Sequence, residues 1–365
     1  MKYLSEYRNL EATKHYLELI EKKATKQWNI MEICGGQTHS LVRNGILELL
    51  PQNVQMIHGP GCPVCVTPVS LIDKAIELLE KGAIVCSFGD MIRVPGSRKS
   101  LLQSKADGGD LRVLYSPLEA VNIAKQNPDK EVVFFAVGFE TTAPANALSV
   151  LHAEKENIQN FSILVSHVLV PPAMEAILAD ELCNIDAFLG AGHVCAIMGY
   201  EEYIPISEKY KTPIVITGFE PLDLVQGIYM AVSQLEAGGY KVENQYARVV
   251  KKEGNKAAME VISKVFEVGS REWRGIGEIP DSGYKISKAY EAYDAELRFK
   301  IAKDETIFNT KCIAGEILKG IKKPFECPVF GTECSPFKPL GAPMVSSEGA
   351  CAAYYHFSNN EKIKV

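Results

Sequence analysis

The chain has 365 residues, of which 47% are hydrophobic and 23% charged, and its formal net charge is −6. This length allows two or three domains with their own cores. The negative charge argues against nucleic acid or an anionic membrane as the main partner. The charged first 26 residues lack a signal-peptide pattern, so we expect a cytoplasmic protein. In a reducing compartment, ten cysteines indicate metal, cluster or redox chemistry rather than structural disulfides.

The first third of the chain alternates short apolar strands with amphipathic helices. An amphipathic helix over residues 4–26 precedes this pattern. The strands are expected at 30–34, 54–57, 83–88 and 111–115, and the helices at 39–50, 70–81, 96–105 and 117–127. Such alternation predicts a parallel sheet with helices on both faces.

A second set of strands and helices follows the first. Its strands are expected at 131–137, 162–165, 187–189 and 214–216, and its helices at 143–155, 171–181, 194–200 and 221–237. The fold class is therefore α/β, with two similar parallel-sheet domains over residues 1–128 and 129–240. Residues 241–365 form a third, loop-rich and proline-rich unit, with helices expected at 257–266 and 284–303.

Cys62 and Cys65 lie two residues apart in a Gly/Pro-rich turn, Gly-Pro-Gly-Cys-Pro-Val-Cys, that follows an apolar strand. A helical pattern begins just after them at Thr67 or Pro68, so both sulfurs are expected near a helix N-terminus, which stabilises thiolate. Such a pair can close and reopen a disulfide and thereby hold two electrons. The same spacing also supplies two zinc ligands, but no second pair completes a zinc site, which favours the redox interpretation.

Cys34 ends the first predicted strand, in the stretch Cys-Gly-Gly-Gln-Thr-His39. The glycines let a ligand approach the backbone, and a thiol with an imidazole beyond it suits a soft metal. One thiolate cannot hold a metal alone, so other ligands would come from a partner or from small molecules. The alternative is a buried cysteine in a tight turn.

Six predicted strands end in glycine-rich or polar turns. Ligands of open parallel sheets bind beyond the carboxyl ends of the strands, so we expect the chemistry there. Glu140, in Gly-Phe-Glu-Thr-Thr, is expected either to position a small ligand or to cap the following helix. His193, in Gly-Ala-Gly-His, is expected to be either functional or a hydrogen-bonded structural histidine.

Four cysteines in the third unit are separated by 14, 6 and 16 residues: Cys312, Cys327, Cys334 and Cys351. Four thiolates suit a [4Fe–4S] cluster or a structural zinc ion. Zinc sites usually take ligands from close pairs, which this spacing lacks, so the cluster is favoured. Glu348, near the last cysteine, is expected to tune the cluster or relay a proton, or else to be a solvated acid.

Several motifs in this order resemble the HypD family of hydrogenase maturation proteins over nearly the whole chain. They are Cys34-Gly-Gly-Gln-Thr-His39, Gly59-Pro-Gly-Cys-Pro-Val-Cys65, Gly138-Phe-Glu-Thr-Thr142, His167-Val-Leu-Val-Pro-Pro172, Gly192-His193 and Gly218-Phe-Glu-Pro-Leu-Asp223. Gln37 departs from the histidine that members often carry. The resemblance implies two similar α/β domains followed by an iron–sulfur domain.

The resemblance also implies a function: assembly of the Fe(CN)2CO group of [NiFe]-hydrogenases. Cys34 resembles the iron ligand, with His39 beside it, and a HypC-type chaperone shares the iron. A HypE-type donor delivers cyanide in a transient complex. Cys62 and Cys65 resemble the redox dithiol, and the four later cysteines resemble the [4Fe–4S] ligands. Whether the family acts as an enzyme, in cyanide transfer or in forming the CO ligand, is left open.

Two other functions fit the same residues. One is a cluster-dependent thiol–disulfide reductase of a protein substrate, which has no need of Cys34. The other is a zinc-stabilised interaction module without redox activity.

Overall fold

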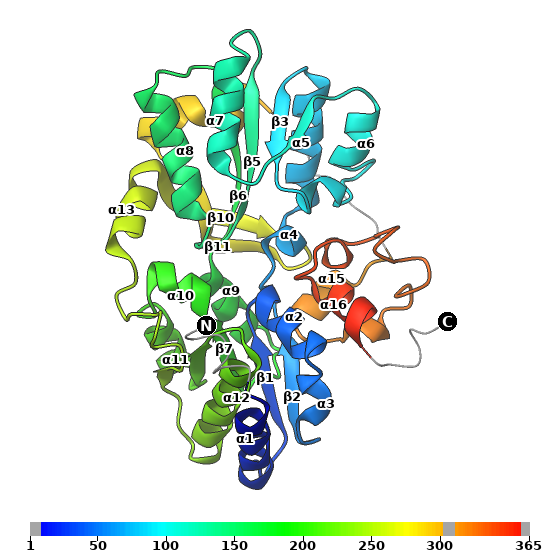
Figure 1. Cartoon of the computed structure of the whole chain (residues 1–365), viewed down its shortest axis with the longest axis vertical. Helices are drawn as coiled ribbons and strands as arrows, with labels where there is room; N and C mark the ends of the chain where they lie inside the picture. The colour runs from blue at the N-terminus through cyan, green and yellow to red at the C-terminus, as the bar shows by residue number, and fades with distance from the viewer. Residues whose placement is uncertain (1–8, 302–310, 359–365) are drawn as a thin grey trace.

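The computed structural model describes residues 9–301 and 311–358, and it contains two parallel sheets covered by helices (Figure 1). This confirms the predicted α/β class with two parallel-sheet units. The five-stranded sheet has the order β2-β1-β7-β8-β9, and the four-stranded sheet has the order β4-β3-β5-β6. Within the described residues, no helix is long and apolar enough to cross a membrane.

The five-stranded sheet joins strands from both halves of the chain: β1 (Trp28–Glu32), β2 (Val54–His58), β7 (Ala187–Ala191), β8 (Ile214–Thr217) and β9 (Val242–Asn244). Its helices are α1 (Leu10–Lys23), α2 (Gly35–Arg43), α3 (Ile46–Leu49), α9 (Val170–Leu178), α10 (Gly192–Met198), α11 (Tyr203–Tyr210) and α12 (Pro221–Glu236). The N-terminal helix predicted at 4–26 is present as α1 and packs on α12, a helix of the region 129–240. Residues 4–8 of that prediction lie outside the described residues.

The four-stranded sheet is built from consecutive strands in the middle of the chain: β3 (Ile84–Ser87), β4 (Leu111–Val113), β5 (Val132–Gly138) and β6 (Phe161–His167). Its helices are α5 (Val69–Glu80), α6 (Leu101–Ala106), α7 (Pro117–Gln126) and α8 (Ala143–Lys155). All residues of β5 and β6 are buried, as expected for strands covered on both faces.

The strands are divided between the sheets differently from the order expected from the sequence. Strand β1 pairs with β2 on one side and with β7 on the other, so the first two strands share a sheet with three late ones. A boundary at residues 128/129 falls between β4 and β5, which belong to one sheet. Apolar periodicity marks a buried strand but does not specify its partner, and for this reason local pattern could not assign the pairing.

A β-hairpin follows the second sheet, formed by β10 (Phe266–Trp273) and β11 (Gly277–Ile286) after helix α13 (Lys256–Val265). The predicted helix at 284–303 is wrong at its start, because Tyr284 and Ile286 lie in β11. Both side chains point from the strand into the core of the four-stranded sheet. The 3-10 helix η3 (Lys288–Tyr293) and the short α14 (Ala295–Arg298) follow, and residues 299–301 are not helical. Residues 302–303 of that prediction lie outside the described residues.

The last described segment is loop-rich, with the short helices α15 (Ala314–Leu318), η4 (Pro324–Glu326), η5 (Ala342–Met344) and α16 (Ala350–Phe357). It lies beside α2, at the right of Figure 1. The four-residue helix α4 (Pro63–Val66) occupies the middle of the molecule, where the chain passes from the five-stranded sheet to the four-stranded one. The predicted helix after it is confirmed as α5.

Candidate metal and redox site

Cys34 lies at the topological switch point of the five-stranded sheet. It follows β1 and directly precedes α2, and the neighbouring strand β7 is followed by Gly192 and His193 at the start of α10. From β1 and β7 the chain connections run in opposite directions across the sheet, so a crevice opens between their carboxyl ends. The residues after these two strands are therefore placed to bind a ligand.

The Cys34 thiol meets the imidazole of His193. Its Sγ lies 3.7 Å from Nδ1 and 3.8 Å from Nε2, and the ring packs on Phe219 at 5.0 Å between centroids. Burial lowers the pKa of His193 to about 4, so the imidazole is neutral at pH 7. A neutral imidazole and a thiol together form a donor pair for a soft metal.

His39, which the resemblance places beside Cys34, is turned elsewhere. Its Nδ1 lies 3.1 Å from the carbonyl oxygen of Ser347, and its ring packs against Phe357 of α16. One further turn of α2 separates its position from Cys34, so its side chain projects toward the C-terminal segment. The structure thus brings His193, and not His39, to the thiol.

Burial raises the pKa of the Cys34 thiol, and the negative charges of Glu348 and Glu32 raise it further. The thiol is therefore protonated when no cation is near. A metal ion would displace this proton, because thiolate is the binding form. The surroundings suit a thiol that ionises on meeting a metal.

A buried chain of hydrogen bonds holds the Cys34 turn in place, and the sequence did not predict it. The Cys34 N–H donates to Glu32 Oε2 at 2.9 Å, and Thr38 donates to the other oxygen. His58 Nδ1 lies 2.8 Å from Glu32 Oε1, and its Nε2 lies 3.0 Å from the Tyr354 hydroxyl on α16. Glu32 stands inside the apolar run of β1, and this position could have indicated the hydrogen bonds, since a buried carboxylate requires partners.

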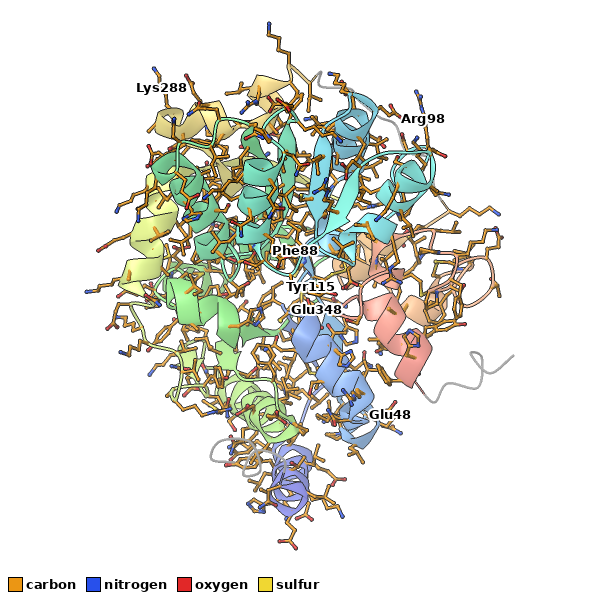
Figure 2. The ribbon with its side chains drawn as sticks, turned by 45° about the horizontal axis from the view of Figure 1, so that its top comes forward. Glu48, Phe88, Arg98, Tyr115, Lys288 and Glu348 are labelled. Carbon is orange, nitrogen blue, oxygen red and sulfur yellow. A yellow bond between two sulfur atoms is a disulfide. The ribbon has the colours of Figure 1, made fainter. Side chains whose placement is uncertain are left out.

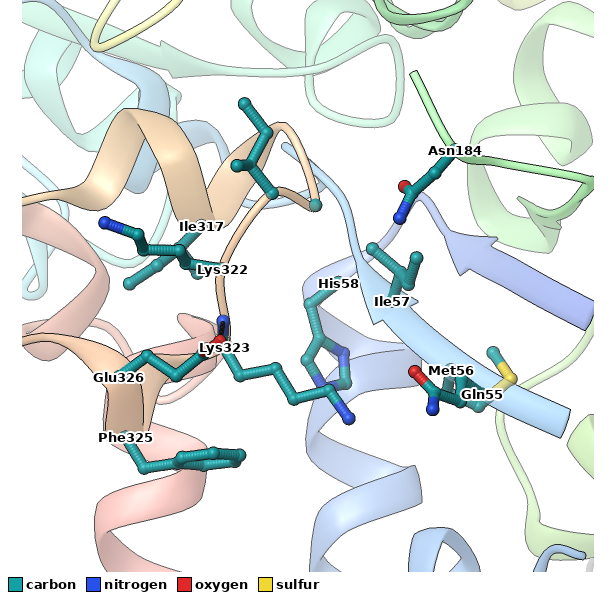
Figure 3. A pocket seen from close by; sticks show the side chains of 12 residues that line it. Gln55, Met56, Ile57, His58, Asn184, Ile317, Lys322, Lys323, Phe325 and Glu326 are labelled. Carbon is teal, nitrogen blue, oxygen red and sulfur yellow. Dashed lines mark hydrogen bonds between the residues drawn. The ribbon is translucent and has the colours of Figure 1, made fainter. Parts of the chain in front are cut away.

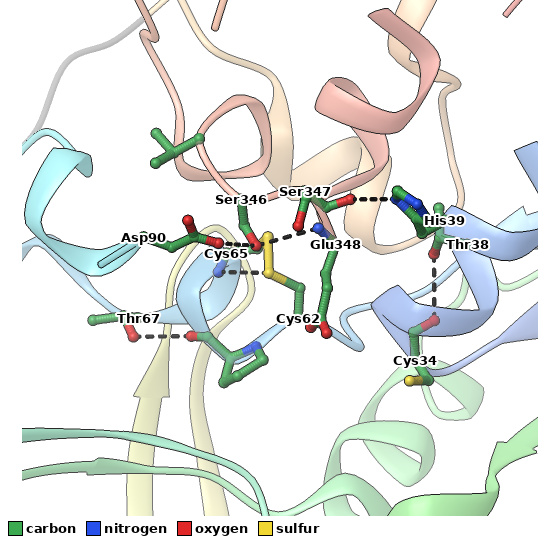
Figure 4. Close-up of a disulfide and its surroundings, with 12 residues drawn as sticks. Cys34, Thr38, His39, Cys62, Cys65, Thr67, Asp90, Ser346, Ser347 and Glu348 are labelled. Carbon is green, nitrogen blue, oxygen red and sulfur yellow. Dashed lines mark hydrogen bonds between the residues drawn. A yellow bond between two sulfur atoms is a disulfide. The ribbon is translucent and has the colours of Figure 1, made fainter. Parts of the chain in front are cut away.

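Cys62 and Cys65 form a disulfide at the N-terminus of α4 (Figure 4). The Cys65 N–H donates to Cys62 Sγ at 3.2 Å. The turn before the disulfide touches the Cys34 turn directly, because the Gly35 N–H donates to the Gly61 carbonyl at 2.9 Å. A Cβ on Gly61 would lie 2.2 Å from the Cys34 nitrogen, so only glycine fits there. The disulfide and the Cys34 turn are thus adjoining parts of one site.

Glu348 reaches this site from the C-terminal segment, near the middle of the molecule (Figure 2). A Cβ on Gly35 would lie 2.4 Å from the Glu348 carbonyl oxygen, so the two backbones are in contact. The Glu348 N–H donates to Ser346 Oγ at 3.3 Å, and the Ser346 hydroxyl donates to the Asp90 carboxylate at 3.1 Å. Burial, followed by the charge of Asp90, raises the pKa of the Glu348 carboxyl. Glu348 is nevertheless an exposed residue, so it lies beside the Cys34 turn with access to solvent.

Three of the four cysteines of the C-terminal segment, Cys327, Cys334 and Cys351, belong to a small core of their own or pack against it. Cys312 lies beside Gly341 of the same segment. Burial raises the pKa of Cys351, and the charges of the other three cysteines raise it further, so all four thiols lie within electrostatic reach. None of the four is in a disulfide. Four neighbouring thiols can all ionise only with cations between them, and this donor set suits a [4Fe–4S] cluster.

Within the described residues, no three His, Cys, Asp or Glu side chains lie close enough together to hold one metal ion. The four thiols are a donor set that either a zinc ion or a [4Fe–4S] cluster would use.

Glu140 is buried away from the switch point, where its Oε1 accepts the N–H of Val170 at 2.8 Å. It therefore binds the first residue of α9 and not the helix α8 that follows it in sequence. Burial raises its pKa to about 8, so the carboxyl keeps a proton at neutral pH. The geometry shows a structural contact for Glu140 and does not bring it to Cys34.

A separate pocket of about 380 Å³ opens between the edge strand β2 and the C-terminal segment (Figure 3). His58 forms part of its wall, together with Lys323 and Phe325. None of the residues predicted for the site is among those that line it. The pocket brings solvent near the outer side of the His58–Tyr354 contact.

The fold and the site define a class: a two-sheet α/β protein whose centre joins a buried thiol, a disulfide and a four-cysteine segment. The family model HypD, described as "Hydrogenase formation hypA family", matches residues 11–358. The chain therefore belongs to the HypD family.

Curated relatives match this chain over nearly their whole length. The hydrogenase maturation factor HypD2 of Bradyrhizobium diazoefficiens is 47% identical over 98% of this chain and 97% of its own. HypD of Azotobacter vinelandii is 46% identical over 100% and 99%. HypD of Escherichia coli is 43% identical over 99% of both chains.

Proposed function

We propose that this protein is a hydrogenase maturation factor that serves as a redox-active scaffold for assembly of the Fe(CN)2CO group. One observation carries the proposal: the Cys34–His193 pair at the switch point adjoins the Cys62–Cys65 disulfide. A metal-binding thiol and a two-electron store are thus side by side. The names of the relatives supply the hydrogenase context.

The iron that is assembled is cargo, and Cys34 is its anchor. Cyanide and CO are strong-field ligands, and soft thiolates suit the remaining positions of an iron that carries them. A second thiolate would come from a HypC-type chaperone. His193, neutral and in contact with the Cys34 thiol, either completes the ligand set or accepts the thiol proton when iron binds.

The Cys62/Cys65 pair supplies the electrons for cyanide release. A HypE-type donor would present cyanide as a thiocyanate. Breaking its S–C bond to give a thiolate and CN⁻ consumes two electrons, and two thiolates that join in a disulfide provide both. Formation of the CO ligand from CO2 at this site is part of the same proposal: CO2, two protons and the two electrons of the dithiol give CO and water.

The disulfide must then be reduced again, and the four C-terminal cysteines would hold the [4Fe–4S] cluster that serves this purpose. When bound, such a cluster supplies electrons one at a time. Glu348 lies between the disulfide and Cys34 with access to solvent (Figure 4), and its raised pKa suits a residue that holds a proton there.

Infrared spectroscopy of the protein, purified anaerobically with its HypC-type partner, tests the scaffold. The wild type should show stretches of metal-bound CO and CN and contain more than the four iron ions of one cluster. Cys34→Ala should lose these bands and keep the cluster spectrum. Cys183→Ala changes a half-buried cysteine remote from the site and should keep both. Loss of bands and cluster together in Cys34→Ala would refute the assignment of Cys34.

The disulfide also favours a second candidate, a cluster-dependent thiol–disulfide reductase. That function predicts turnover of a protein disulfide by the Cys34→Ala variant at the wild-type rate. A brown, iron-loaded protein without CO or CN bands that shows this turnover would favour the reductase over the scaffold.

A further inference from the structure

The turn of the β10–β11 hairpin lies between the disulfide helix and the four-cysteine segment. The Arg274 N–H donates to the carbonyl oxygen of Val66, the residue after Cys65, at 2.7 Å. On its other side, a Cβ on Gly275 would lie 2.7 Å from Gly315 Cα, and Gly275 has a φ of +77° that favours glycine. The turn is therefore in backbone contact with α4 and with α15, which begins two residues after Cys312.

The Arg274 side chain extends into this junction. Its Nη2 donates to the Pro95 carbonyl at 3.3 Å, and its Nη1 is inaccessible to solvent. Burial lowers the pKa of the guanidinium, and the charges of Cys312 and Asp73 counteract this. Arginine nevertheless stays charged in proteins, because its ordinary pKa is above 12. A fixed positive charge thus lies within electrostatic reach of Cys312.

We propose that Arg274 is a positioning residue that raises the reduction potential of the cluster held by the four cysteines. The proposal rests on the proposed function, because it assumes that cluster. Reduction adds one electron, and therefore one negative charge, to a centre already surrounded by four thiolates. A buried cation stabilises the reduced form more than the oxidised form, and charge near a cluster is one of the factors that set its potential.

The backbone contact gives this charge a defined place relative to the disulfide. The N–H of Arg274 binds the Val66 carbonyl and holds its backbone at the end of α4, while the hydrogen bond to the Pro95 carbonyl holds the guanidinium. Asp73 also interacts with Arg274, and its Oδ1 accepts the N–H of Ser97 at 2.9 Å. The effect to be measured is therefore that of the arginine with Asp73 in place.

The midpoint potential of the cluster tests the proposal, measured in the full-length holoprotein by an anaerobic titration followed by electron paramagnetic resonance. Arg274→Met should disfavour reduction at least tenfold, which corresponds to about 59 mV for one electron. Arg274→Lys keeps the charge and should show a smaller decrease. Lys285→Met is the matched control. It removes an exposed cation of the same hairpin, paired with Glu267 at 3.1 Å, and should leave the potential unchanged.

An unchanged potential in Arg274→Met with full iron content would overturn the proposal. If Arg274→Met loses its cluster, the potential is measured instead in Arg274→Gln, which keeps hydrogen-bond donors. A lowered potential there supports tuning, whereas loss of the cluster from both neutral variants makes Arg274 a structural residue and overturns it. A wild-type protein that holds zinc, or no metal, would instead refute the proposed function.

Discussion

The thiol of Cys34 and the imidazole of His193 come from residues 159 positions apart, and the pairing of β1 with β7 brings them together. If the imidazole contributes to iron binding, His193→Gln should lower the retention of iron in the complex with a HypC-type partner roughly tenfold to a hundredfold. The cluster spectrum should be retained. The measurement is iron content together with infrared band intensity.

His152→Gln is the control for that experiment, because His152 lies on α8 and pairs with Glu156 of the same region at 3.3 Å. Wild-type band intensity in His193→Gln would show that the contact with Cys34 is structural.

Glu140 predicts a pH dependence of stability. Burial raises its pKa from 4.5 to about 8. Between these values the folded protein keeps a proton that the unfolded chain has lost, so the free energy of unfolding falls as the pH rises. From pH 5 to pH 8 this loss amounts to roughly 3 kcal/mol. Glu140→Gln cannot titrate and should lack it, as measured by chemical denaturation at each pH.

Two histidines act in the opposite direction at lower pH. Burial lowers the pKa of His193 to about 4 and that of His167 to about 3. Below their ordinary pKa near 6.5, the unfolded chain binds protons that the folded protein does not, so the free energy of unfolding rises with pH up to about 6.5. Both histidines are present in wild type and variant. The difference between the two proteins therefore isolates Glu140, and parallel pH curves would contradict its assignment.

At the level of elements, the disulfide turn is locked onto the Cys34 turn by Gly61. Gly61→Ala would place a Cβ 2.2 Å from the Cys34 nitrogen, in contact with backbone that cannot rotate away. We expect a loss of about 1–3 kcal/mol in the free energy of unfolding, and a lower iron content in the complex, because the two turns must separate. Thermal denaturation and iron analysis measure the two effects.

Gly89→Ala provides the matched control, because it changes another glycine that follows a strand. Its Cβ would lie 3.7 Å from Val113, which is ordinary contact. Equal losses in both variants would mean that the close approach of Gly61 has no special role.

For the whole molecule, the sequence predicted the elements better than their arrangement. Each of the eight apolar runs that it marked as a strand is a strand, because buried parallel strands show as continuous apolar segments. Sheet membership depends on contacts between distant residues, which no local period contains. The hairpin was missed because glutamates, an arginine and a glycine interrupt the apolar pattern of β10. Exposed polar positions of this kind do not resemble a strand buried on both faces.

The same limit applies to the site. Cys34, Cys62 and Cys65 could be predicted as site residues because the glycine-rich turns around them and the two-residue spacing of the pair are visible in the local sequence. Whether His39 or His193 meets the thiol depended on strand pairing and on the direction of a side chain on α2. Glu32 binds His58, and Arg274 contacts Val66 and Pro95, through pairings between residues distant in sequence that no local pattern contains.

The C-terminal segment should depend on metal for its fold. Its core is small and consists of Ile317, Val329, Cys334, Met344, Ala350 and Cys351. Where cysteines hold a metal centre, the free energy of binding contributes directly to folding. Removal of iron by a chelator under anaerobic conditions should therefore speed proteolysis within residues 311–358 at least tenfold, while fragments that span the two sheets persist. Mass spectrometry locates the cuts.

The double variant Cys62→Ser, Cys65→Ser, with its iron intact, should resist cleavage as the wild type does. Equal resistance of the chelated and loaded proteins would show that the segment folds without metal.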